Sequence, residues 1–296
     1  MGELLSWLQK NPSIVAALVA AAVTVAINFF GKIYVDHRME TLKSDLARSK
    51  AENDAKIEYE LEARKRLYGA IGNLRFQLLL AARDVANQVT SYGRGRQFDL
   101  TTTNYFGQST LHKLVMPFAF CELIEKQISY ADFSVDPEAV DLLRLKRSVY
   151  TAFCSGASIL NHPDANWEDE EQHVFRHSLD RISNSLLTPD SSQSLFPMPF
   201  HEFEKFVPIE KNAAKLSPLP YLMHDFSIDR KPQFWIRLVL YGYLCSKFVN
   251  EKGQPVGFNK IDFPLGELIG KVNDKYFLSK KAELVKQFEE IAESGI

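Results

Sequence analysis

Cysteine is scarce in this chain of 296 residues, and no two cysteines stand close together. The three are Cys121, Cys154 and Cys245, an odd number without a CxxC pair. A disulfide scaffold or a cysteine-rich zinc site needs more cysteines at closer spacing, so neither is expected. The scarcity is typical of a reducing compartment, which favours a cytosolic location for most of the chain.

The motifs of common catalytic sites are also missing. The sequence contains no GxGxxG, Walker loop, GxSxG or HExxH. These absences argue against nucleotide-driven work and against a nucleophile-elbow hydrolase, so no enzyme activity and no cofactor are predicted. The formal net charge of -2 lacks the basic excess of polyanion binders, and no nucleic-acid partner is expected.

One long apolar run stands near the N-terminus. Residues 13–30 read SIVAALVAAAVTVAINFF and contain no charged side chain. About 20 apolar residues span a bilayer core of roughly 30 Å, so this run needs the apolar residues that follow it. We predict a short external N-terminus, residues 1–12, and a transmembrane helix over residues 13–35. The anchor positions are Ile14, Leu18, Val23, Ile27, Phe29, Phe30 and Tyr34.

Basic residues beside this run predict its direction. Residues 31–50 contain Lys32, Arg38, Lys43, Arg48 and Lys50, whereas Lys10 stands alone on the N-terminal side. Because cytoplasmic flanks carry the excess of basic residues, we expect the N-terminus outside and the rest in the cytoplasm, at the inner (plasma) membrane. A cleaved signal peptide is disfavoured, since the start lacks a basic region and the exit residues are bulky.

A helical stalk is predicted next, over residues 36–64. No proline occurs between residues 32 and 87, which favours one continuous helix. Coiled-coil spacing separates the apolar residues Val35, Met39, Leu42 and Leu46, after which Ser49 and Asn53 interrupt the pattern. Two interpretations stay open: a stalk through which copies of the chain form a homo-oligomer, and a single solvated helix with mixed charges.

The rest of the chain predicts a globular helical body, so the expected fold class is all-α. An antiparallel bundle is assigned to residues 65–188, with helices over 109–130, 138–160 and 167–187. Residues 189–233 are rich in proline and phenylalanine and predict an ordered strap packed on the bundle. Residues 234–296 predict further packed helices. The apolar segment 234–249 is interrupted by charges, which indicates a core helix rather than a second span.

Scattered segments in the middle of the chain carry a resemblance. They are Arg66-Leu67-Tyr68, Ser109-Thr110-Leu111, the run from Phe118 to Ile124, and the run from Glu171 to Ile182. Together they resemble an uncharacterised group of bacterial single-pass membrane-anchored helical proteins. The resemblance implies an anchor followed by a helical bundle and implies no activity.

The best candidate for a metal site is Glu170, His173 and His177. If residues 167–187 are helical, these three side chains share one face, and zinc accepts such ligands. Acidic residues at a helix start are equally explained by the helix dipole. Candidate acid/base pairs are His201-Glu202 and His224-Asp225.

A candidate contact for lipid headgroups or other anions is formed by Arg94 and Arg96 in the sequence GRGR. Two arginines in a turn can hold a phosphate or an acidic headgroup, and they can equally be solvated.

The leading hypothesis is a membrane-tethered, non-enzymatic interaction or sensor protein with a cytosolic protein partner. Its sharper form is a bacterial antiviral-defence effector that acts by self-assembly at the membrane. One alternative is a membrane-anchored, metal-dependent hydrolase or nuclease using histidines in residues 162–225. Another is an envelope structural or lipid-binding protein.

Overall fold

The computed structural model describes residues 12–95, 100–128, 137–189 and 194–295. Within these ranges all elements are helical except one small antiparallel hairpin. The hairpin pairs β1 (Leu187–Pro189) with β2 (Leu195–Pro197), with Thr188 opposite Phe196. The predicted all-α fold class is confirmed.

The first helix, α2 (Pro12–Gly93), is 82 residues long. Pro12 is its first residue, a position where the missing amide hydrogen costs nothing. The chain divides into two compact units, residues 1–62 and residues 63–296, and α2 contributes to both. Below, the second unit is called the body, and each unit is described by itself.

In the first unit, apolar side chains of α2 are exposed. Val25 and Phe30 each expose 68% of their surface. Among the described residues, the part of α2 from Pro12 to Gly69 is the one helical stretch long and apolar enough to cross a membrane, and its most apolar part is not buried at all.

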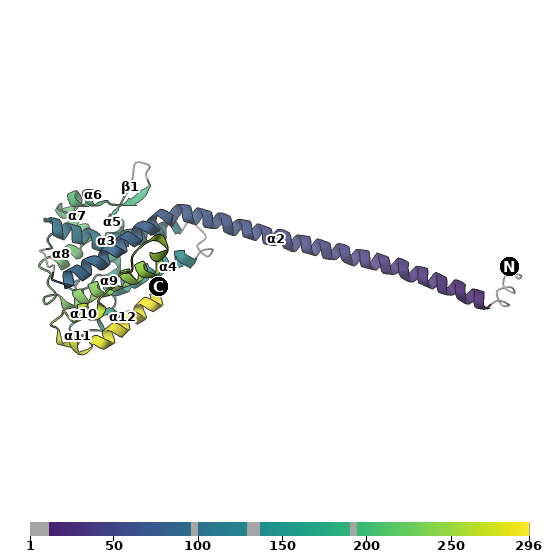
Figure 1. Ribbon diagram of the computed structural model, residues 1–296. Helices are drawn as coiled ribbons and strands as arrows, with labels where there is room; N and C mark the ends of the chain where they lie inside the picture. The colour runs from purple at the N-terminus through teal and green to yellow at the C-terminus, as the bar shows by residue number, and fades with distance from the viewer. Residues whose placement is uncertain (1–11, 96–99, 129–136, 190–193, 296) are drawn as a thin grey trace. The chain divides into compact units, whose positions relative to one another are not determined.

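The body consists of the C-terminal part of α2 and a set of packed helices (Figure 1). The longer helices are α3 (Tyr105–Ile128), α4 (Pro137–Cys154), α5 (Arg176–Ser185), α9 (Pro232–Lys252) and α12 (Lys281–Gly295). Shorter helices are η2 (Ala157–Ile159), α6 (Phe200–Phe206), α7 (Glu210–Ala213), η3 (Ala214–Leu216), α8 (Leu219–Met223), η4 (Gln254–Val256), α10 (Leu265–Ile269) and α11 (Lys275–Ser279).

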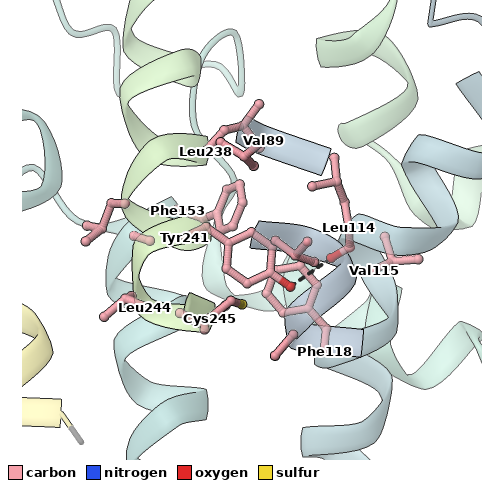
Figure 2. Close-up of a cluster of buried hydrophobic side chains, with 14 of the residues drawn as sticks. Val89, Leu114, Val115, Phe118, Phe153, Leu238, Tyr241, Leu244 and Cys245 are labelled. Atoms are coloured by element: carbon pink, nitrogen blue, oxygen red, sulfur yellow. Dashed lines mark hydrogen bonds between the residues drawn. The ribbon is translucent and has the colours of Figure 1, made fainter. Parts of the chain in front are cut away.

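Helix α9 is the centre of the body and contacts α4, η2, α10 and α12. Most of its side chains are buried, as predicted for a core helix. Tyr241 lies at the middle of the packing (Figure 2), where its hydroxyl donates to the Leu114 carbonyl at 3.0 Å and its ring stacks on Phe118 at 5.3 Å. Gly242 gives α2 a close approach, because a Cβ there would lie 3.1 Å from the Cβ of Val89.

The structure differs from the sequence prediction between α4 and β1. A helix was expected over residues 167–187, but α5 begins only at Arg176, and residues 167–175 are irregular. The backbone there is held by side chains instead of helical hydrogen bonds. The Glu170 carboxylate accepts from the Phe175 amide at 2.6 Å, and Arg237 of α9 donates from Nε to the Gln172 carbonyl at 3.1 Å.

Candidate functional site

The predicted anchor positions form a continuous exposed apolar surface on α2. Exposure ranges from 40% at Ile14 to 68% at Phe30. A polar group within this run is satisfied locally, since the Thr24 hydroxyl donates to the Ala20 carbonyl at 2.8 Å. A bilayer offers no hydrogen-bond partners, so this internal bond makes Thr24 tolerable in a lipid-facing helix.

The predicted stalk stripe is also exposed, again within the first unit. Its four members expose between 49% of the side chain, at Met39, and 73%, at Leu46. Around the stripe the surface is charged, with an ion pair of Arg48 and Glu52 at 3.1 Å. Exposed i, i+4 pairs of this kind contribute only about 0.3–0.5 kcal/mol.

The structure does not unite the three residues of the metal candidate on one helix face. Glu170 and His173 precede α5, whereas His177 is inside it with a fully exposed side chain. The Glu170 carboxylate is already engaged by the Phe175 amide. Among the described residues, no group of three or more His, Cys, Asp or Glu side chains is placed to hold a metal ion.

His173 is instead buried against two aromatic residues that are themselves exposed, Trp167 and Phe175. Its ring lies 4.8 Å from the rings of both Trp167 and Phe175, and Nε2 has no hydrogen-bond partner in the described part of the chain. Burial and the nearby Arg237 guanidinium lower the pKa of His173 below its usual value of 6.5. His173 is therefore held as a neutral ring.

Arg237 is a buried, multiply hydrogen-bonded charge that was not among the residues predicted from the sequence. Only 1% of it is exposed, and its guanidinium is held by oxygen acceptors: Nη1 donates to the Ala152 carbonyl at 3.0 Å, the Ser155 carbonyl at 2.7 Å and the Ser158 hydroxyl at 2.6 Å. The sequence feature that could have indicated it is an arginine inside the apolar segment 234–249. Ala152 lies in the last turn of α4, Ser155 directly follows it and Ser158 is in η2, so Arg237 caps α4 and ties it to the segment after it.

Neither the Cys154 thiol nor the two predicted acid/base pairs forms part of a larger polar cluster in the described part of the chain. Burial raises the pKa of Cys154 to about 11, so its thiol stays protonated at neutral pH. His201 and Glu202 approach to 3.8 Å, and His224 and Asp225 to 3.6 Å, each pair exposed on the surface.

Of the two arginines predicted to contact anions, Arg96 lies outside the described residues. Arg94 follows the end of α2 and is exposed. It lines an open groove of about 600 Å³ together with Arg83 and Lys260. Lys260 was not predicted, because it stands far away in the sequence.

No family model, no curated protein and no solved structure matches this chain.

Proposed function

We propose that this chain is a single-pass, membrane-tethered interaction or sensor protein whose helical body lies in the cytoplasm. The observation that carries the proposal is the contrast within the chain. The apolar side chains of residues 12–30 are exposed, whereas most of those of the body are buried in one continuous core. An apolar helix that is not buried in protein needs another apolar environment, and a bilayer provides one.

The direction of the anchor follows from its flanks. The five basic residues after the span favour a cytoplasmic location for the body and an outside location for residues 1–12. The inner (plasma) membrane is the location that agrees with this direction. The buried thiols of Cys121 and Cys245 suit a reducing cytoplasm.

Self-assembly through the stalk is the second part of the proposal. Anchors inserted in the same direction hold the stalks of neighbouring copies parallel and at the same height. With Leu42 and Ser49 at d positions, Leu46 and Asn53 occupy a positions. A single polar Asn at an a position fixes register and favours a dimer at some cost in stability. Asp45 at g faces Lys50 at e of the partner copy, which adds an attractive pair.

A non-enzymatic role is supported by the chemistry of the candidate residues. His173 is packed among aromatic rings, the Glu170 carboxylate is engaged by the backbone, and the Cys154 thiol is protonated. In this proposal the body binds a cytosolic partner rather than transforming a substrate.

In the defence form of the proposal, the self-assembled anchors perturb the membrane. Comparing the survival of phage-challenged cells that carry the native chain with that of cells carrying an Asn53→Lys variant would test it.

Deleting residues 1–31 tests the tether. We expect the shortened chain to move from the membrane fraction to the soluble fraction with helical circular dichroism retained, and the native chain to stay in the membrane fraction. A shortened chain that remains with the membrane, or a native chain that is already soluble, would contradict the proposal.

A further inference from the structure

A groove of about 600 Å³ lies within the body, between one face of α2 and the segment of residues 256–262. The α2 side chains recur at intervals of four and three residues, so they share one helix face. They are Phe76, Leu80, Arg83, Asn87 and Thr90, and Arg94 continues the row just after the helix ends. All of the groove residues belong to the body, so the site does not depend on the anchor or the stalk.

The wall opposite α2 is held rigidly. Asn250 of α9 fixes it with two hydrogen bonds: its amide donates to the Ile261 carbonyl at 2.9 Å, and its side-chain oxygen accepts from the Ile261 amide at 2.7 Å. The Phe258 amide donates to the Gly253 carbonyl at 3.0 Å. Gly257 makes the turn between them with φ of +88°, a conformation that favours glycine. A wall fixed in advance costs less entropy when a ligand binds.

One part of the groove is aromatic. The rings of Phe76 and Phe258 meet edge to face at 5.7 Å, and 42% of Phe76 is exposed. The Arg83 guanidinium lies 5.9 Å from the centre of the Phe258 ring, and it pairs with Asp84 at 2.9 Å. Flat aromatic faces with an adjacent guanidinium suit a planar ring of a ligand.

Another part is cationic. In the part of the chain that the structure describes, the side chains of Arg94 and Lys260 form no salt bridge, and both are exposed in the groove. Arg94 stands eleven positions after Arg83, which corresponds to about 16 Å along the direction of α2. A cation after a helix C-terminus is favourable in itself, but that does not account for Lys260 across the groove.

We propose that this groove binds a nucleotide, with the planar base against Phe258 and the phosphates between Arg94 and Lys260. Asn87, Thr90 and Asn259 add neutral polar groups to the lining of the groove, and Asp262 is the acidic residue in that lining. Since the chain has no Walker loop, the nucleotide acts as a bound signal and not as a fuel.

Titration calorimetry on the full chain in detergent tests the site, with ATP, adenosine, inorganic phosphate and dihexanoyl phosphatidylglycerol as probes. We expect saturable ATP binding that Arg94→Ala and Lys260→Ala each weaken about tenfold, because charge-assisted contacts to phosphate are lost. Phe258→Ala weakens ATP binding and leaves phosphate binding unchanged. Adenosine binds at least about tenfold more weakly than ATP, for want of the same phosphate contacts.

The matched control is Arg147→Ala, an exposed arginine of α4 outside the groove, which should bind ATP as the native chain does. Circular dichroism confirms that each variant is folded. Absence of ATP binding, or equal binding by the native chain and the Arg94→Ala variant, would overturn the proposal. Binding of the lipid alone, lost in Arg94→Ala, would overturn the nucleotide and assign the groove to a phospholipid headgroup.

Discussion

At the scale of single residues, Arg237 is the clearest case of a buried charge that organises its surroundings. Burial lowers its pKa to about 10, which still leaves the guanidinium protonated at neutral pH. In the described part of the chain no carboxylate forms a salt bridge with Arg237, so the carbonyl oxygens of Ala152, Ser155 and Gln172 compensate its charge. Such a residue is expensive to remove, because its acceptors are then buried without donors.

Arg237→Met should therefore lower the free energy of unfolding by about 3 kcal/mol, measured by urea denaturation of the full chain in detergent. Arg237→Lys should lower the free energy of unfolding by a smaller amount, since one ammonium group reproduces only part of the planar fork of donors. Arg147→Met, on an exposed arginine, should change stability by less than about 0.5 kcal/mol. Equal stabilities of the Arg237 and Arg147 variants would refute this role.

His173 predicts a dependence of stability on pH. Its pKa is lowered in the folded protein, so the unfolded chain takes up a proton first as the pH falls through the usual value of 6.5. Stability is consequently lost from about pH 6.5 downward, until the folded pKa is reached. His112, whose pKa burial also lowers, acts in the same direction.

Acidifying from about pH 7.5 to about pH 5.5 should destabilise the native chain more than His173→Leu, because the variant lacks one of these groups. His177→Leu, which replaces a fully exposed side chain, is the control and should follow the native chain. An identical loss in the native chain and His173→Leu would contradict the role of His173.

At the scale of elements, periodicity was a good guide wherever a helix is held by its own hydrogen bonds. The segment 234–249 was predicted as a core helix, and α9 extends it by two or three residues at each end. Proline also had a positional meaning, since α9 begins with Pro232 and α8 has Pro220 in its first turn. The predicted start of α5 was wrong because Arg237, distant in sequence, holds residues 167–175 in another conformation.

The candidate sites also fall into two groups, those that follow from a local sequence pattern and those that the fold brings together. The anchor and Arg94 follow from local patterns, namely an apolar run and a basic turn. The groove could not be predicted, because α2 and residues 256–262 are joined only by the fold, and neither Phe258 nor Lys260 carries a motif. The aromatic contacts of His173 were missed for a different reason: Trp167 and Phe175 are near it in sequence, but residues 167–175 are irregular and not the predicted helix.

The stalk makes its own prediction, for which the sequence offers a matched pair of serines. Ser49 stands at a d position of the proposed parallel coiled coil and Ser44 at an outward f position. Mild oxidation in membranes should therefore cross-link Ser49→Cys into dimers much faster than Ser44→Cys, because only d-position Cβ atoms approach within disulfide reach. Equal rates, or none, would favour a single solvated helix.

At the scale of the whole molecule, the chain combines an exposed apolar helix with a body whose core is closed. The anchor is short, and its basic residues stand mainly on one side. These two properties together lead to the central claim that the chain crosses the membrane once, with its body in the cytoplasm.

Labelling of single cysteines in intact cells tests that claim most directly. A membrane-impermeant maleimide should label Ser6→Cys in intact cells, and it should label Lys286→Cys, at an exposed position of α12, only after lysis. The native chain is the background control, because Cys121 and Cys245 are buried and Cys154 is half-buried. Labelling of Lys286→Cys in intact cells would reverse the direction, and failure to label Ser6→Cys until lysis would contradict the membrane crossing itself.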